Sequence, residues 1–248
     1  MSQNAHTALV LIPAYNEAGV IGAVIREIRA TPIGIPYEIM VVDDGSTDDT
    51  AQEARDAGAR TVSLLQNLGY GYALQTGYQV AREEGFDLVV QMDGDGQHAP
   101  ESIPGLLAPL LKDECDLVIG SRALSPVFYP MPYIRRCGQK VFAAILFAMC
   151  GLRIRDPTSG FQAFGAHALR FFTTDDFPGD YPDANVLLYL QLNGMRIREV
   201  PAIFRINTRG TSMHGGVLKP LYYIYKMLFS MLLMYLRHRH SGGEGGHP

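Results

Sequence analysis

The chain has 248 residues, 47% of them hydrophobic, which is enough apolar material for the core of one large α/β domain. Its formal charge of −4 gives no overall attraction to polyanions and disfavours nucleic acid as a partner. The three cysteines, Cys115, Cys137 and Cys150, lack both a disulfide framework and metal-ligand spacing, which favours a reducing compartment, the cytoplasm. We expect no export signal and no clean membrane span, because the apolar stretches at 141–150 and 217–236 are short or interrupted.

The first half of the chain alternates apolar strands with amphipathic helices. Strands are predicted at residues 8–12, 37–42, 60–64 and 87–92, and helices at 16–29, 47–56 and 73–84. A helix at 101–111, a strand at 115–119 and a helix at 133–150 follow. Alternating strands and helices with short connections are typical of a mostly parallel, doubly wound α/β sheet, in which ligands bind beyond the carboxyl ends of the strands.

Pairs of polar residues follow three of the predicted strands. They are Asn16 with Glu17, Asp43 with Asp44, and Asp93 with Asp95. Capping of the next helix is one explanation for each pair, and Asn16 in particular is placed to cap the first helix. The position that the pairs share favours a second explanation, namely convergence at one rim of the sheet.

Asp93 and Asp95 end the fourth predicted strand and are flanked by glycines. In extended backbone their side chains point to the same side, so together they can bind one divalent cation, with Gln97 adding an oxygen. Such oxygen ligands suit Mg²⁺ or Mn²⁺, whose remaining positions are often filled by water and substrate phosphate, so the pattern favours a diphosphate ligand. A solvated Asp-Gly turn is the alternative.

Eight stretches occur in a fixed order between residues 9 and 212. They are PAYNE at 13–17, VVDDGSTDDT at 41–50, Asn67 with Gly69, Gly71 and Gly77, DGDGQH at 93–98, GSR at 120–122, DPTSGF at 156–161, EVP at 199–201 and RGTS at 209–212. In these stretches the chain resembles the inverting family 2 glycosyltransferases, which have the nucleotide-sugar-binding GT-A fold. The resemblance is strongest to the branch of dolichyl- and polyprenyl-phosphate sugar synthases.

The resemblance implies roles for residues on the donor side. The nucleotide would be lined by Pro13, Tyr15, Glu17, Asp44 and Asp93. A divalent metal ion would be bound by Asp93 and Asp95 with help from Gln97, and would stabilise the leaving nucleotide, with Asp95 counted among the catalytic residues. No redox cofactor is implied.

On the acceptor side, the resemblance implies a lipid phosphate collected by four residues, Arg122, Arg135, Ser159 and Arg209. Taken from the residues alone, Arg122 is either a phosphate ligand or a salt-bridge partner. A phosphate monoester is already ionised and attacks without a protein base, whereas a hydroxyl acceptor requires one. Asp183 is the candidate base for that case, and helix N-capping by Asp183 is the alternative.

The C-terminal part of the chain carries an apolar stripe at helical spacing. It comprises Leu218, Leu221, Tyr222, Tyr225, Leu228, Phe229, Leu232 and Leu236. Together with the basic run at 237–240 this favours a helix in the membrane interface, and packing on the core or in a homo-oligomer is the alternative. We expect a catalytic domain at 1–212, an amphipathic helical segment at 213–240 and a disordered tail at 241–248.

The sequence therefore predicts a metal-dependent, inverting glycosyltransferase that uses Mg²⁺ or Mn²⁺. It would move a hexose from a UDP- or GDP-sugar to polyprenyl or dolichyl phosphate, as a peripheral protein at the cytoplasmic face of the membrane. One alternative is transfer to a saccharide or small hydroxyl acceptor in cell-surface polysaccharide synthesis. A different class altogether is a nucleotide-sugar-binding protein without catalytic activity.

Overall fold

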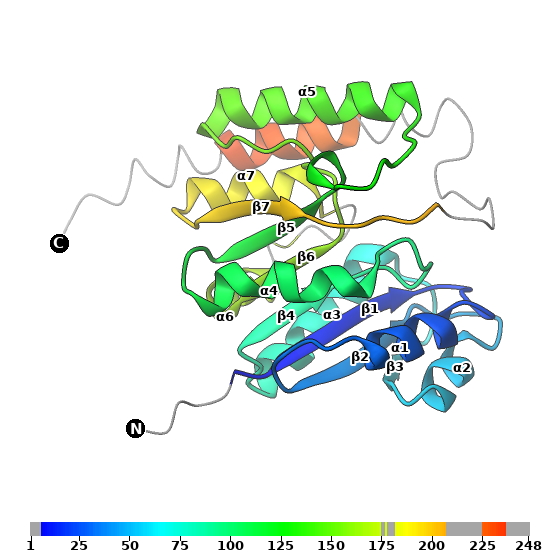
Figure 1. The fold of residues 1–248 in the computed structure, drawn as a ribbon. Helices are drawn as coiled ribbons and strands as arrows, with labels where there is room; N and C mark the ends of the chain where they lie inside the picture. The colour runs from blue at the N-terminus through cyan, green and yellow to red at the C-terminus, as the bar shows by residue number, and fades with distance from the viewer. Residues whose placement is uncertain (1–5, 175–176, 178–181, 207–224, 237–248) are drawn as a thin grey trace, which may run out of the picture.

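The computed structural model describes residues 6–174, 177, 182–206 and 225–236, which form a seven-stranded mixed sheet covered by helices on both faces (Figure 1). The strands are β1 (Ala8–Ala14), β2 (Tyr37–Asp43), β3 (Arg60–Ser63), β4 (Leu88–Gln91), β5 (Leu117–Ser121), β6 (Gln162–Gly165) and β7 (Ile197–Pro201). Their order across the sheet is β3-β2-β1-β4-β6-β5-β7. The predicted α/β class, with a mostly parallel sheet, is confirmed.

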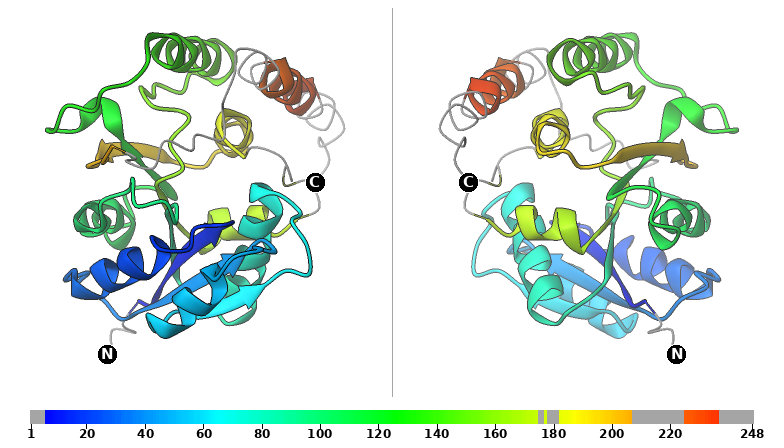
Figure 2. Two further views of the ribbon diagram at one scale, coloured as in Figure 1. Left: turned by 90° about the vertical axis from the view of Figure 1, so that its right-hand side faces the viewer. Right: turned by 90° about the vertical axis from the view of Figure 1, so that its left-hand side faces the viewer.

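The helices form two layers. They are α1 (Ile21–Ala30), α2 (Thr50–Asp56), α3 (Tyr70–Glu83), α4 (Ile103–Leu111), α5 (Tyr133–Cys150), α6 (Ala166–Phe172) and α7 (Ala184–Leu192), with short 3-10 turns η1 (Pro100–Ser102) and η2 (Arg122–Leu124). Apolar side chains of α1 and α4 pack on one face of the sheet, and those of α3, α5, α6 and α7 pack on the other. The two edge-on views of Figure 2 show these layers.

The position of β1 in the middle of the sheet explains why its sequence is continuously apolar. All seven of its residues are buried, with Leu9 and Leu11 in one apolar cluster and Val10 and Ile12 in the other. A strand covered by helices on both sides needs apolar side chains on both sides. The continuous run at 8–12 is the consequence.

Strand β6 runs against its neighbours, whereas β1, β2, β3 and β4, and also β5 and β7, pair in parallel. In the ladders, Gln162 at the start of β6 lies opposite Gln91 of β4 and Ile119 of β5. The segment 156–161, which precedes β6, therefore arrives at the rim where β4 and β5 end. This reversal was not predicted.

The first helix begins later than predicted. It starts at Ile21, and the prediction that Asn16 caps it was wrong. Asn16 has a positive φ of 55°, and its side-chain oxygen accepts hydrogen bonds from the backbone N–H and the hydroxyl of Thr47, at 2.9 and 3.3 Å. A tertiary contact between two loops therefore takes the oxygen that local capping would have used.

Helix α3 lies unusually close to β1 because it carries a glycine at the contact. A Cβ atom on Gly77 would lie 2.3 Å from Cδ1 of Leu11, so no other residue fits without movement. The helix also begins at Tyr70, three residues before the predicted start at Ala73. Both features bring the first turn of α3 to the carboxyl end of β4.

Residues 225–236 are helical and lie beside α5 and above α7 in Figures 1 and 2. Met227 and Met231 are buried in the core, and the Asn185 amide donates a 3.0 Å hydrogen bond to the Ser230 hydroxyl. Another face of this helix is exposed, with Phe229 51% accessible. In the part of the chain that the structure describes, no helix is long and apolar enough to cross a bilayer. The remainder of the predicted segment 213–240 and the tail 241–248 lie outside the described residues.

Candidate functional site

The loops after β1 and β2 are hydrogen-bonded to each other at the carboxyl end of the sheet. The backbone N–H of Asn16 donates to the Ser46 hydroxyl at 2.9 Å, and that of Glu17 donates to the Thr50 hydroxyl at 2.8 Å. Beside these loops, the Tyr15 ring is 44% exposed. Pro13 is buried at the end of β1, opposite Val42. Of the predicted nucleotide-lining residues, Pro13 thus lies at the end of β1, and Tyr15 and Glu17 lie in the loop that follows.

Asp44 supports the neighbouring loop. Its carboxylate is buried and accepts hydrogen bonds from the backbone N–H groups of Leu68 and Gly69, at 2.8 and 2.9 Å. A carboxylate has about four acceptor positions, so these bonds leave capacity for a ligand. Gly45 follows with a positive φ of 68°, and a Cβ there would lie 2.5 Å from the Gln66 carbonyl carbon. Asp44 and Gly45 together bring the 66–69 loop to the rim.

Asp93 lies just beyond β4, at the centre of the site. Its carboxylate is 34% exposed, and the Tyr70 hydroxyl donates a 3.0 Å hydrogen bond to Oδ1. Burial raises the pKa of Asp93, while the hydrogen bond from Tyr70 and the positive charges of Arg122 and Arg135 act in the opposite direction. Desolvation therefore opposes the negative charge of this carboxylate, and a bound cation would relieve that cost.

His98 holds the turn that carries Asp93. Its Nδ1 accepts a 2.9 Å hydrogen bond from the backbone N–H of Asp93, and its Nε2 lies 3.5 Å from Oδ2 of the same residue. The ring stacks on Phe161 at 4.8 Å and meets the edge of Phe204. Burial lowers the pKa of His98 to about 4, so the ring is neutral at pH 7. With Nδ1 as acceptor, the single proton resides on Nε2 and faces the Asp93 carboxylate.

Asp95 and Gln97 complete the turn after β4. Oδ1 of Asp95 accepts from the Gln97 backbone N–H at 2.9 Å, and Oδ2 accepts from the Gln97 side-chain amide. The amide oxygen of Gln97 instead accepts from the Tyr129 hydroxyl at 3.1 Å. Gln97 thus presents nitrogen, not oxygen, to Asp95 in this arrangement.

The residues of this turn fit a hard divalent cation by donor type. Asp93 and Asp95 supply two carboxylates, and the charge of Asp93 is disfavoured by burial. The Gln97 amide oxygen, which here accepts from Tyr129, would join them only after the amide turns. Within residues 6–174, 177, 182–206 and 225–236, no group of three or more His, Cys, Asp or Glu side chains is arranged to hold a metal. A metal here would therefore take its other ligands from water and substrate oxygens, as Mg²⁺ commonly does.

Arg122 is engaged in a buried ion pair with Asp156. Nε and Nη2 of Arg122 donate to the two oxygens of Asp156 at 2.7 and 2.8 Å, and the backbone N–H of Arg122 donates to Oδ2 at 3.0 Å. Nη2 also donates to the Thr158 carbonyl at 3.0 Å. Burial lowers the pKa of Arg122, but the Asp156 contacts outweigh this and raise it. The salt-bridge alternative is therefore observed, while Nη1 makes no hydrogen bond with the described residues.

The structure describes two of the other three predicted acceptor residues, and these two differ in exposure. Arg135 is exposed in the first turn of α5, and its charge acts on Asp93 and His98. Ser159 was predicted to contact the phosphate, but in the structure it is 1% exposed and its hydroxyl donates to the Gly120 carbonyl at 2.6 Å. Arg209 lies outside the described residues.

Asp183 stands at the N-cap position of α7, but its side chain makes no capping hydrogen bond. Its backbone N–H donates to the Asn185 side chain at 3.0 Å. Its negative charge raises the pKa values of Tyr70 and Arg122, although burial dominates in Tyr70 and opposes the rise in Arg122. Asp183 is thus close enough to the site to act on it electrostatically.

Sequence reasoning assigned no role to several residues that shape this site. They are Tyr70, Gln91, His98, Tyr129 and Asp156. The signal available was weak: Gln91 is a polar residue at the end of an apolar strand, and Asp156 begins the DPTSGF stretch. Neither pattern indicates which residue is the hydrogen-bonding partner until the fold is known.

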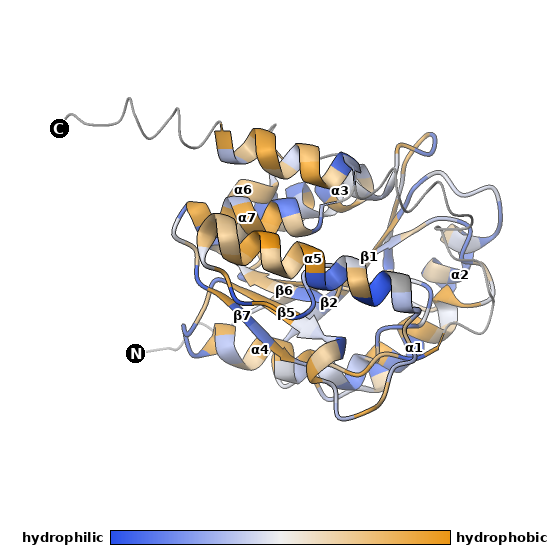
Figure 3. Ribbon diagram, turned by 90° about the horizontal axis from the view of Figure 1, so that it is seen from above, coloured by the Kyte–Doolittle hydropathy of each residue, from blue (hydrophilic) through white to orange (hydrophobic). Residues whose placement is uncertain are grey.

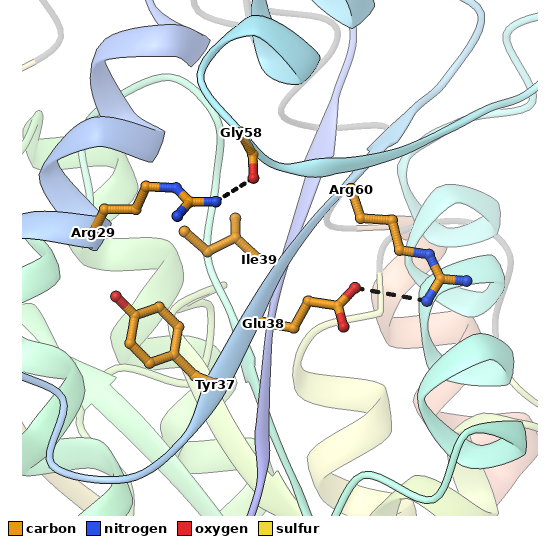
Figure 4. A pocket seen from close by; sticks show the side chains of 6 residues that line it. All are labelled: Arg29, Tyr37, Glu38, Ile39, Gly58 and Arg60. Carbon is orange, nitrogen blue, oxygen red and sulfur yellow. Dashed lines mark hydrogen bonds and ion pairs between the residues drawn. The ribbon is translucent and has the colours of Figure 1, made fainter.

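A hollow elsewhere on the molecule is not part of this site. It lies at the amino-terminal ends of β2 and β3 and is lined by Arg29, Tyr37, Glu38, Ile39, Gly58 and Arg60 (Figure 4). Its arginines already have partners, since Arg29 donates to the Gly58 carbonyl and Arg60 pairs with Glu38 and Glu84. The opposite rim, with Asp93, remains the candidate site.

The chain is similar to known proteins in both sequence and structure. The model of the family described as Glycosyl transferase family 2 matches residues 9–170. Over 250 residues the chain is 30% identical to the UDP-N-acetylglucosamine--dolichyl-phosphate N-acetylglucosaminyltransferase of Methanococcus voltae, with 91% of this chain and 94% of that protein covered. It is 32% identical over 219 residues to the undecaprenyl-phosphate mannosyltransferase of Micrococcus luteus, with 84% and 88% covered.

Solved structures show the same fold. Glucosyl-3-phosphoglycerate synthase from Mycobacterium tuberculosis, in complex with phosphoglyceric acid, is similar with a TM-score of 0.64 at 25% identity, covering 95% of this chain and 80% of that chain. The complex of the same enzyme with Mn²⁺, UDP-glucose and phosphoglyceric acid gives a TM-score of 0.66 at 24% identity, with 94% and 80% covered, which is a likeness of fold alone. The predicted GT-A fold is confirmed.

Proposed function

The chain belongs to glycosyltransferase family 2, in the branch related to dolichyl- and polyprenyl-phosphate sugar synthases, and from this membership we propose the reaction that it catalyses. It transfers a hexose from a UDP- or GDP-sugar to polyprenyl or dolichyl phosphate, with inversion at the anomeric carbon. The Methanococcus voltae and Micrococcus luteus relatives, which are named for transfer to dolichyl and undecaprenyl phosphate, support this acceptor class.

The observation that carries the proposal is the meeting of opposite charges at one rim. The positive charges of Arg122 and Arg135 both act on the Asp93 carboxylate. Acidic residues suited to a metal-bound diphosphate and basic residues suited to a second phosphate are therefore within electrostatic range of each other. This combination suits a reaction that joins a nucleotide sugar to a phosphate.

On the donor side, we propose that Pro13, Tyr15, Glu17 and Asp44 line the nucleotide. The exposed ring of Tyr15 and the remaining acceptor positions of Asp44 suit a base and a ribose. A divalent ion, Mg²⁺ or Mn²⁺, bound by Asp93, Asp95 and Gln97 would stabilise the negative charge of the leaving diphosphate.

On the acceptor side, we propose that Arg122 through Nη1, Arg135 and Arg209 hold the lipid phosphate. One phosphate oxygen attacks the anomeric carbon from the face opposite the leaving group. The bond from that carbon to the diphosphate oxygen breaks, and its electron pair departs with the nucleoside diphosphate. The acceptor is already ionised, so no protein base removes a proton.

A surface beside the site suits contact with the membrane. Figure 3 shows α5 hydrophilic at its N-terminal end and hydrophobic towards its C-terminus, beside the apolar C-terminal helix. Basic residues Arg135, Arg136 and Lys140 are exposed at the first end, and Phe147 is half-exposed near the second. Apolar side chains next to basic ones favour binding to an anionic lipid surface, which we propose to be the cytoplasmic face. We further propose residues 1–212 as the catalytic domain and 213–240 as the membrane-contacting segment.

The test incubates the purified full chain with Mg²⁺ or Mn²⁺, undecaprenyl phosphate and a panel of UDP- and GDP-sugars, followed by mass spectrometry of the lipid. We expect one donor to give a lipid-linked hexose that disappears when EDTA is added. Absence of glycosylated lipid with every donor would overturn the proposed acceptor.

The same assay distinguishes the second candidate, transfer to a saccharide or small hydroxyl acceptor. It is supported by the influence of the Asp183 charge on Tyr70 and Arg122, which suits a base that acts near the site. If saccharides rather than lipid phosphate are glycosylated, Asp183→Asn should abolish turnover. With a phosphate acceptor, we expect the same variant to retain most of its activity.

A further inference from the structure

A chain of hydrogen bonds runs from the interior of the protein to the partly exposed Asp93 carboxylate. The Tyr78 hydroxyl donates to Oε1 of Gln91, and Nε2 of Gln91 donates to the Tyr70 hydroxyl at 3.1 Å. The Tyr70 hydroxyl in turn donates to Oδ1 of Asp93 at 3.0 Å. Tyr78 and Gln91 are 2% and 3% exposed, so both lie in the interior.

The fold brings these four residues together by simple periodicity. Tyr70 and Tyr78 are eight residues apart on α3, which places them on the same face of the helix. Val89 and Gln91, two residues apart on β4, lie on the side of the sheet that α3 covers, and Val89 shares an apolar cluster with Tyr78. Asp93 follows two residues later, just beyond the strand. The close approach of α3 to the sheet at Gly77 brings the hydroxyl groups within hydrogen-bonding distance of the strand.

The direction of every hydrogen bond in the chain is fixed. An ionised carboxylate can only accept, so the Tyr70 hydroxyl donates its proton to Asp93, and its oxygen is left to accept from Nε2 of Gln91. This orients the amide so that Oε1 accepts from the Tyr78 hydroxyl. Burial raises the pKa of Tyr70 well above its ordinary value, which keeps that proton in place at neutral pH.

Two neighbours restrict the carboxylate further. Nε2 of His98 lies 3.5 Å from Oδ2, on the oxygen that Tyr70 does not contact. A Cβ added to Gly160 would lie 3.1 Å from the Tyr70 hydroxyl oxygen and 3.6 Å from Oδ1 of Asp93, so the backbone of the 156–161 segment lies against this bond. Asp93 therefore has little freedom to rotate.

We propose that Tyr70, backed by Gln91 and Tyr78, is a positioning residue that fixes the orientation of the Asp93 carboxylate for binding a divalent cation. The inference rests on the proposed function, because that function assigns the cation to Asp93. Residues that orient a metal ligand through a hydrogen bond commonly change metal affinity by about 10- to 100-fold when they are removed. Tyr70 acts through Asp93 and does not itself touch the cation.

The experiment measures Mn²⁺ binding directly, from the electron paramagnetic resonance signal of free Mn²⁺, in the presence and absence of UDP. Tyr70→Phe removes one hydroxyl and keeps the ring, and we expect it to weaken Mn²⁺ binding about 10-fold or more. Tyr78→Phe removes the far end of the chain and should weaken binding less. The control is Tyr72→Phe, because Tyr72 lies on the same helix, is 49% exposed and makes no side-chain hydrogen bond with the described residues.

Two further measurements, the thermal unfolding of each variant and its binding of UDP without metal, distinguish a loss of Asp93 orientation from a general loss of folding or of nucleotide binding. A loss of Mn²⁺ affinity in Tyr70→Phe, with metal-free UDP binding unchanged and Tyr72→Phe like wild type, supports the proposal. Wild-type Mn²⁺ affinity in Tyr70→Phe overturns the proposal and leaves the metal site intact. If the wild-type protein binds no Mn²⁺ with UDP present, the metal site itself is wrong and the positioning role falls with it.

Discussion

Replacing Asp156 with Asn should destabilise the protein strongly, because it removes the negative partner of a buried arginine. The side chain of Arg122 is 7% exposed and that of Asp156 is 0% exposed. The Asp156 carboxylate accepts three hydrogen bonds from Arg122 and one from the Gln139 amide at 2.5 Å. In Asp156→Asn an amide NH₂ faces these donors, and the charge of Arg122 loses the carboxylate to which it is hydrogen-bonded.

The expected size follows from the burial of the pair. Removal of one partner from a buried ion pair typically costs about 3–5 kcal/mol. The amide oxygen that remains in Asn still accepts some of the hydrogen bonds, so we expect the lower end, about 3 kcal/mol. For a chain of this length that corresponds to a fall of roughly 6–12 °C in Tm.

Urea unfolding followed by circular dichroism measures the change. The matched control is Glu114→Gln, which removes the exposed ion pair with Arg198, whose side chains are 52% (Arg198) and 41% (Glu114) accessible. That change should cost less than about 1 kcal/mol. A cost below about 1 kcal/mol for Asp156→Asn would refute the reasoning. Replacing Arg122 and Asp156 together with Leu should cost less than either single replacement.

Three further changes test other parts of the structure. Gly77→Ala should lower the free energy of unfolding by about 1–3 kcal/mol in urea, because its Cβ would lie 2.3 Å from Cδ1 of Leu11, whereas Gly105→Ala, with no atom within 4 Å of the added Cβ, should not. Burial lowers the pKa of His98 to about 4 from 6.5, so the unfolded chain binds more protons between these pH values, and stability should fall by about 3 kcal/mol as the pH drops from 6.5 to 4. His98→Gln should lose this part of the pH dependence, and an unchanged slope in that variant would contradict the assignment. Asp95→Ala should abolish metal-dependent UDP binding in calorimetry with an unaltered circular dichroism spectrum, and undiminished turnover would exclude Asp95 as a ligand.

The sequence predicted the elements whose signals are local. The apolar run of β1 and the helix at 133–150 were both predicted, because a strand buried on two faces is continuously apolar and a long stretch without Pro or a turn signal favours a helix. The start of α1 was missed because Asn16 uses its oxygen for Thr47, in a loop distant in sequence. Strand β6 was missed because four residues, QAFG, give little periodicity.

The candidate site was predictable only as a set of residue types. Asp93, Asp95 and Arg122 were identified from the sequence, since strand ends and charges are local features. The partners were not, because Tyr70 meets Asp93 and Arg122 meets Asp156 only after the sheet and its helices have packed. For Arg122 the structure shows the salt bridge that was one of two alternatives predicted from the sequence, and for Ser159 it shows a hydrogen bond within the protein where the resemblance implied a phosphate contact.

The reversed strand β6 also marks a boundary at which related enzymes can be recombined. Strands β1–β4 come from residues 8–91 and β5–β7 from residues 117–201. The two groups share one ladder, the four residue pairs between β4 and β6. A chimera joined at residues 99–102 would therefore exchange the proposed acceptor side of one transferase for that of another, with the β4–β6 ladder and the short bridge between His98 and Phe204 to re-form across the joint.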